Sequence, residues 1–138
     1  MIIVTVTAIA GTMLWSSDPL LSRHAIRVFS YFGKRRVLKK LDHQKVALEV
    51  RAFARRSRWD VSAAAFPITY IASDERAFPS DFKNWGASGI RIFDDRAELE
   101  FGGTPFHFGI AVFRDGERGF GVHQLGEGVW FYSEDGSL

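Results

Sequence analysis

The sequence predicts an α+β protein in which N-terminal helices precede a five-stranded antiparallel β-meander, covered on one face by a helix. Two observations predict this class. Residues 19–57 carry apolar side chains at helical spacing between start and stop signals. The last fifty residues contain five short alternating runs separated by turn residues. The 138 residues are 46% hydrophobic and 25% charged, which is typical of one globular domain. The chain has no cysteine, which excludes disulfides, zinc–thiolate sites and cysteine nucleophiles.

Residues 1–17 carry no charged side chain. As a helix they would span about 25 Å, against a hydrocarbon core of about 30 Å. We therefore expect residues 1–17 to form an N-terminal membrane anchor. The alternative is a buried β-strand, because "IIVTVT" is β-branched and alternates.

Residues 18–41 are predicted to form a basic amphipathic helical segment. Asp18 suits the helix cap, Pro19 suits the first helical position and Gly33 suits the exit, after which "KRRVLKK" follows. An anionic membrane attracts such a segment by about 1 kcal/mol per basic residue near its surface. We therefore expect residues 23–40 to contact an anionic membrane surface. An anchor followed by an excess of Lys and Arg places the globular part in the cytoplasm.

The charges are divided unevenly along the chain. Residues 18–60 hold 12 Lys and Arg against 4 Asp and Glu, whereas residues 61–138 hold 6 against 12. The resulting balances of +8 and −6 sum to the net charge of +2. The basic half is therefore expected to face an anionic surface, to pack near the acidic half, or simply to form a solvated basic helix face. We do not expect nucleic-acid binding, because no stacking motif accompanies the basic residues.

A second helix is predicted at 42–57, with Val46, Val50 and Phe53 as its buried stripe. The segment at 59–89 is predicted to be irregular, with one short helical turn, because prolines interrupt it.

Residues 42–138 are predicted to form one α+β globular domain, with the meander at 89–132. Turn lengths set its registers, and a slip by one residue would move every side chain to the other face. The expected pairs are Ile90–Leu99, Arg91–Glu98, Leu99–Phe108, Glu100–His107, Ile110–Phe120, Phe108–Val122, His107–His123 and Gln124–Trp130. These registers agree on one apolar face, consisting of Ile90, Ile92, Leu99, Phe101, Phe106, Phe108, Ile110, Val112, Phe120, Val122 and Tyr132. We expect the helix at 42–57 to cover this face.

The second face of the predicted sheet carries a polar row with a glycine trough beside it. Its candidate binding residues are Arg91, Glu98, Glu100, His107, Gly109, Gly121 and His123, with Phe113, Leu125, Val129 and Phe131 as apolar neighbours. One interpretation is a cross-strand Glu–His pair on the solvated side of a sheet. Another is a binding face that receives a protein or peptide partner, or a second copy of the chain.

The function predicted from these features is a non-enzymatic, membrane-associated interaction module that uses the second face of its sheet. The alternative is a small metal-dependent enzyme built on Glu100, His107 and His123, because two imidazoles and a carboxylate are a workable ligand set. We favour the module, because side chains on a flat sheet point parallel and converge poorly on a metal. No cofactor is expected.

Two short motifs resemble those of uncharacterised bacterial proteins of similar size. The first is a Gly-rich turn before a His-aromatic-Gly step, here Gly102, Gly103, His107, Phe108 and Gly109. The second is a closing aromatic group, here Gly128, Trp130, Phe131 and Tyr132, which departs from the pattern because its aromatic residues follow Val129. The resemblance covers about the last fifty residues and implies an apolar N-terminal segment, a helical region and a terminal meander. It implies no reaction, cofactor or substrate.

Overall fold

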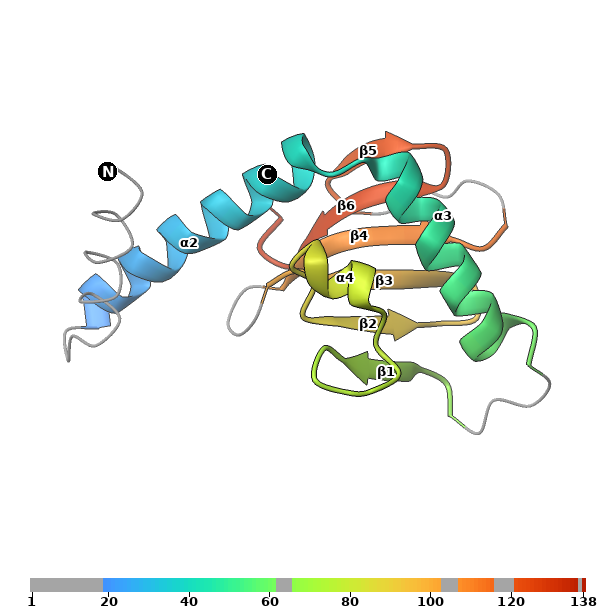
Figure 1. The fold of residues 1–138 in the computed structure, drawn as a ribbon. Coiled ribbons are helices and arrows are strands. Elements are labelled where there is room, and N and C mark those ends of the chain that lie inside the picture. The colour runs from blue at the N-terminus through green and yellow to red at the C-terminus, as the bar shows by residue number, and fades with distance from the viewer. Residues whose placement is uncertain (1–18, 62–65, 103–106, 116–120, 137) are drawn as a thin grey trace.

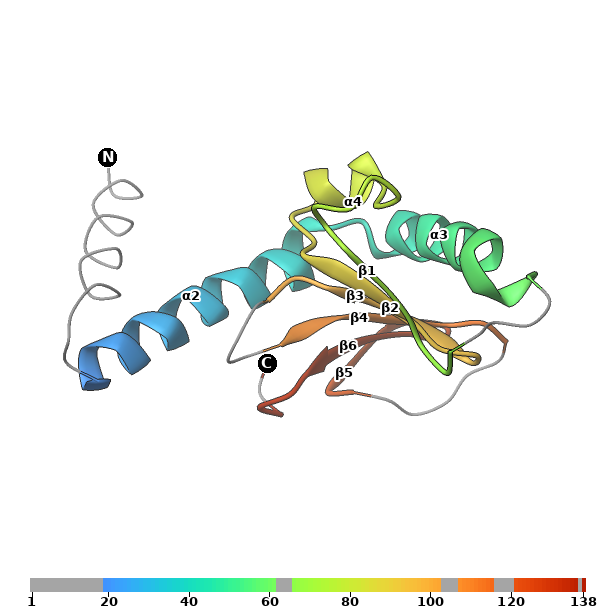
Figure 2. The same ribbon diagram turned by 90° about the horizontal axis from the view of Figure 1, so that it is seen from below.

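The computed structural model describes residues 19–61, 66–102, 107–115, 121–136 and 138. Along the chain lie α2 (Pro19–Lys40), α3 (His43–Ala54), a π-helical turn (Arg55–Trp59), β1 (Thr69–Ala72), α4 (Ser80–Asn84), β2 (Gly89–Ile92), β3 (Arg96–Glu100), β4 (Phe108–Phe113), β5 (His123–Gly126) and β6 (Val129–Ser133). The strands form one antiparallel six-stranded sheet in the order β1-β2-β3-β4-β6-β5. Helices α3 and α4 lie on one face of this sheet, as Figures 1 and 2 show. The predicted α+β class is confirmed.

The sheet differs from the predicted meander in two respects. β1 is an additional strand within the segment that was predicted to be irregular, and β6 rather than β5 pairs with β4. The physical reason for the exchange is burial. Val129, Phe131 and Tyr132 of β6 are all buried, whereas three of the four positions of β5 are exposed. A strand that is apolar on both faces gains most inside a sheet, and a short polar strand suits its edge.

The first hairpin has the register that the sequence predicts. Ile90 pairs with Leu99, and Arg91 pairs with Glu98. The next pairing is shifted by two residues, because Leu99 faces Ile110 and Glu100 faces Gly109. An even shift leaves every side chain on its predicted face. The predicted pair of Gln124 with Trp130 is also confirmed.

The faces of β6 are the reverse of the prediction. Phe131 lies opposite Ile110 on the face that α3 covers, and Tyr132 lies opposite Gly109 on the second face. Pairing with β4 sets this orientation, and it buries Phe131 completely. Phe106 and Phe120, which were predicted on the apolar face, lie outside the described residues.

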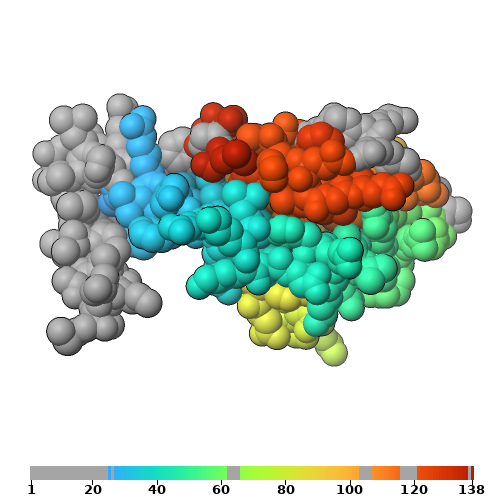
Figure 3. All heavy atoms as spheres, turned by 90° about the horizontal axis from the view of Figure 1, so that it is seen from above, coloured from blue at the N-terminus to red at the C-terminus, as the bar shows by residue number. Residues whose placement is uncertain are grey.

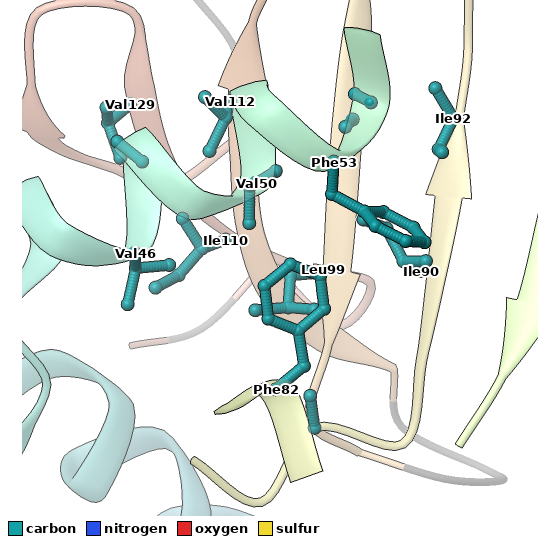
Figure 4. Close-up of a cluster of buried hydrophobic side chains, with 14 of the residues drawn as sticks. Val46, Val50, Phe53, Phe82, Ile90, Ile92, Leu99, Ile110, Val112 and Val129 are labelled. Carbon is teal, nitrogen blue, oxygen red and sulfur yellow. The ribbon is translucent and has the colours of Figure 1, made fainter. Parts of the chain in front are cut away.

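The hydrophobic core lies between α3, α4 and the sheet (Figure 4). The predicted stripe of Val46, Val50 and Phe53 is buried, which confirms the second helix and its orientation. The side chain of Asp42 caps α3 by accepting hydrogen bonds from the backbone N–H groups of residues 44 and 45. From α4, Phe82 packs edge-on against Phe53, with ring centroids 5.6 Å apart. Figure 4 shows these side chains meeting Leu99 and the neighbouring strands.

Helix α2 does not end at Gly33, as the sequence predicted, but runs on to Lys40. A Cβ atom at Gly33 would lie 2.7 Å from the ring of Phe108, so the glycine allows α2 to approach β4 closely. Val37, one turn further, is buried in the core. The rest of α2 extends away from the sheet (Figure 1).

The membrane anchor predicted at residues 1–17 lies outside the described residues. Among the helices that the structure describes, none is both long and apolar enough to cross a membrane.

Two ion pairs join the basic half of the chain to the acidic half. The buried Lys34 of α2 lies 2.8 Å from a carboxylate oxygen of Asp135. The buried Arg58 lies 2.7 Å from Asp94, and it also donates to the backbone carbonyl oxygens of Phe66 and Pro67. Some of the opposite charges in the two halves of the chain therefore pair with each other within the fold.

Candidate functional site

The predicted binding residues of β2 and β3 converge in an ion cluster on the second face, which consists of Arg91, Arg96, Glu98 and Glu100. The Nε atom of Arg91 lies 2.5 Å from Glu100 Oε1 and 3.5 Å from Glu98 Oε2. The Nε atom of Arg96 donates to Glu98 Oε1 at 2.7 Å. Alternation with period two explains why three members come from one strand, since residues 96, 98 and 100 share a face of β3.

The carboxylates of the ion cluster are buried, whereas the side chains of Arg91 and Arg96 are partly exposed. The side chains of Glu98 and Glu100 are only 5% and 6% exposed. All residues of β4 beside them are buried as well. Two guanidinium groups balance the two carboxylates, which is what buried charges require. The carboxylates at the centre of the second face are therefore covered, and the two arginines reach the surface.

Two tyrosine side chains occupy the space above the glycines of this face. A Cβ atom at Gly109 would lie 2.9 Å from the Tyr132 hydroxyl and would collide with the carbonyl oxygen of Leu99. A Cβ atom at Gly89 would lie 2.6 Å from the hydroxyl of Tyr70. The predicted glycine trough is therefore filled at Gly109. Because Gly89 and Gly109 are the register partners of Glu100, the tyrosines flank this carboxylate on both sides.

Burial raises the pKa values of Glu100, Tyr70 and Tyr132. Burial raises the pKa of Glu100, and the charges of Arg91 and His107 oppose this shift. Burial, with a second contribution from the Glu100 charge, also raises the pKa values of Tyr70 and Tyr132. The two tyrosines therefore lose their protons only at a higher pH than an ordinary tyrosine does, and Glu100 binds a proton more readily than an ordinary glutamate does.

The remaining predicted site residues divide into two places. His107 lies just before β4, where its carbonyl oxygen accepts from the backbone N–H of Glu134 at 2.9 Å. Its buried Nδ1 atom has no hydrogen-bond partner among the described residues. His123 lies on the edge strand β5 opposite Phe131, and Gly121 precedes that strand with a φ of 74°. Only His107 stays near Glu100.

The expected row of Glu100, His107 and His123 does not form. β6 lies between β4 and β5 and separates the two histidines. Within the part of the chain that the structure describes, no group of three or more His, Asp or Glu side chains is arranged to hold a metal ion. Arg91 already engages the carboxylate of Glu100. The hypothesis of a metal-dependent enzyme therefore loses its ligand set.

Sequence reasoning missed three participants, which are Arg96, Tyr70 and Tyr132. The strand "RAELE" carried the signal for Arg96, because its charged residues alternate with apolar ones. Tyr70 belongs to the short strand "TYIA", which Pro67 obscured. Tyr132 was placed on the wrong face because β5, rather than β6, was expected to pair with β4.

A second candidate surface lies on α2. Seven of its exposed side chains form the α2 face, which comprises Phe29, Tyr31, Phe32, Arg35, Arg36, Lys39 and Lys40. At about 100° per residue these seven positions cover roughly half of the helix circumference. The opposite side carries the buried Lys34 and Val37, which pack against the domain. The helix sequence contains no acidic residue. This surface can meet an anionic and partly apolar partner.

Comparison with protein-family models, curated proteins and solved structures finds no significant match to this chain. The resemblance of the last fifty residues to uncharacterised bacterial proteins stays a prediction.

We predict that Gly109→Ala destabilises the protein by about 1–3 kcal/mol or more, because the new methyl group must displace Tyr132 and the β3 backbone. Gly126→Ala is the matched control, since a Cβ atom there meets only Val129, at 4.0 Å. Urea denaturation measures both variants. Equal stability of Gly109→Ala and the parent protein would contradict the packing of Tyr132 over Gly109.

We predict that Glu100 titrates above its ordinary value of 4.5. Because the native state binds this proton more tightly than the unfolded chain does, Glu100 favours folding below that value. The contribution is lost as the pH rises through the native pKa. Carboxyl-detected NMR titration measures the midpoint. Arg91→Met should raise it further, because the Arg91 charge lowers the pKa.

The control for this titration is Lys83→Met, which removes an exposed cation from α4 on the opposite face of the sheet. It should leave the midpoint of Glu100 unchanged. A midpoint at or below the ordinary value in the parent protein would refute the burial of this carboxylate.

Proposed function

We propose that the protein is a non-enzymatic interaction module that associates with an anionic membrane surface through the α2 face and presents its α+β domain to a partner. The observation that carries the proposal is the exposed arc of three aromatic and four basic side chains on α2. In this proposal, the apolar residues 1–17 and the basic residues after them keep the domain at the cytoplasmic side of the membrane.

The composition of the α2 face suits the interface between lipid headgroups and acyl chains. Phe29, Tyr31 and Phe32 are between 42% and 53% exposed, which is unusual for aromatic side chains in a soluble domain. Aromatic rings favour the headgroup region, and Lys and Arg side chains favour anionic lipid. Because both kinds of side chain lie on one arc, they can contact the same surface at once.

The position of α2 also supports this proposal. Its C-terminal part is held by Lys34 and Val37, and the part before them extends beyond the sheet (Figures 1 and 3). A helix that projects from its domain can lie along a flat surface without the domain blocking the approach. The polar side chains of the ion cluster on the second face are less available to a partner, because they already pair with one another.

The proposal predicts that the full-length protein binds vesicles containing phosphatidylglycerol more tightly than neutral phosphatidylcholine vesicles, and less tightly as salt rises. The triple variant Arg35→Gln, Lys39→Gln, Lys40→Gln should weaken binding to anionic vesicles about a hundredfold, at about 1 kcal/mol per basic residue. Co-sedimentation over a lipid titration measures the partition coefficients. Residues 1–17 are unchanged in the variant, so the difference reports on α2 alone.

The matched control removes three exposed basic residues elsewhere, in the variant Lys45→Gln, Arg76→Gln, Lys83→Gln. It alters the net charge by the same amount and should bind almost as the parent does. Equal losses in the two triple variants, or equal binding of the parent to neutral and anionic vesicles, would refute the role of the α2 face.

A further inference from the structure

A groove lies between the flank of α3 and the β5–β6 hairpin. Its volume is about 580 Å³, and it is open to solvent. Figure 3 shows this side of the molecule, with α3 in teal and green beside the C-terminal strands in orange and red. The buried residues Ala47 and Val129 line it from below, and Phe113 at the end of β4 contributes its backbone carbonyl oxygen. Leu48, which is 68% exposed, and the half-buried Leu125 add apolar walls.

The polar side chains around the groove are mainly basic. Arg51, Arg55 and Arg114 line it, together with His43, and the one carboxylate among the lining residues belongs to Glu127. Arg51 lies on α3, and Arg55 follows one turn later as the first residue of the π-helical turn. Arg114 follows β4 on the other side, where its Nε atom lies 3.4 Å from a carboxylate oxygen of the exposed Asp115. Cations from two elements therefore face the same apolar space.

The central arginine is held in a fixed orientation by backbone groups. Arg51 donates from Nε to the carbonyl oxygen of Phe113 at 3.2 Å and from Nη2 to that of Glu127 at 3.3 Å. Carbonyl oxygens orient a guanidinium without neutralising its charge. A fixed guanidinium loses less entropy when it binds a carboxylate, which favours recognition at this position.

These features discriminate between kinds of partner. Single-stranded nucleic acid needs an exposed aromatic ring on which bases stack, and Phe113 is only 4% exposed. Strand addition to β5 is disfavoured, because this edge strand has four residues and an irregular register at residues 124 and 126. A concave site with apolar walls and separated cations suits a chain that carries carboxylates on either side of an apolar residue.

We propose that this groove binds an acidic segment of a partner protein. An apolar side chain of the segment lies between Leu48 and Leu125, and flanking carboxylates meet Arg55 and Arg114. The inference rests on the proposed function only in treating the protein as an interaction module. Binding of the acidic segment takes place in the groove and requires no lipid.

The experiment uses full-length protein without vesicles and a twelve-residue peptide in which Leu and Phe are flanked by Asp and Glu. Amide chemical shifts are followed by NMR during titration. Saturable shifts are expected at residues 47, 48, 125, 126 and 129. The same peptide with Asn and Gln in place of its acids should bind at least about tenfold more weakly, because it lacks the charge-assisted contacts.

Matched variants test the assignment of residues. Arg55→Gln, Arg114→Gln should weaken binding of the acidic peptide about tenfold, and Leu48→Gln should weaken it as well. All three positions are exposed, so the fold should be retained. The control Lys45→Gln, Arg76→Gln removes the same charge outside the groove and should have little effect.

Three outcomes would overturn the inference. They are the absence of saturable shifts at the groove up to millimolar peptide, shifts confined to α2, and equal losses in the variant and the control. Because no membrane is present, each of these outcomes leaves the vesicle experiment to decide the role of the α2 face independently.

Discussion

The burial of β4 on both faces is the constraint on which the rest of the structure depends. β4 lies between β3 and β6, and each of its six residues is buried. On one face Ile110 and Val112 meet α3, so large side chains fill the core. On the other face Gly109 and Ala111 are small, and larger side chains from the neighbouring strands take the space above them. Tyr132 and the two glutamates of β3 become buried for this reason, and the arginines of β2 and β3 then have to compensate their charge.

Some charged side chains form ion pairs within the fold, and others stay exposed on its surface. Arg58, Lys34 and the ion cluster use their charges within the fold, where each guanidinium or ammonium group meets a carboxylate. Exposed basic side chains form one group on α2 and another around the groove beside α3, and single ones such as Lys45, Arg76 and Lys83 lie elsewhere. One of the two groups lies on a helix and the other in a concave site. A membrane-facing helix and a partner-binding groove on one small domain would bring a partner to the lipid surface.

The sequence predicts the parts of the fold that depend on local pattern. The stripe of Val46, Val50 and Phe53 gives α3 its orientation, and the pair of Ile90 with Leu99 follows from a two-residue turn. The order of β5 and β6 depends instead on which of the two strands has more apolar side chains to bury. The lengths of the turns carry no information about this difference. The alternation of the sequence correctly placed Arg91, Glu98 and Glu100 on one face. It could not predict that the glutamates are buried, because their burial depends on contacts with Tyr132 and β4. The continuation of α2 through Gly33 likewise depends on the ring of Phe108, a tertiary contact.

The placement of β6 between β4 and β5 is the central claim, because it sets the face of Tyr132 and separates His107 from His123. Interstrand backbone NOEs in the full-length protein test it directly. The structure predicts NOEs between Ile110 and Phe131 and between Ala111 and Trp130, and also between Gln124 and Trp130. Backbone NOEs between Phe108 and Val122, with none between Ile110 and Phe131, would place β5 beside β4 and contradict the account.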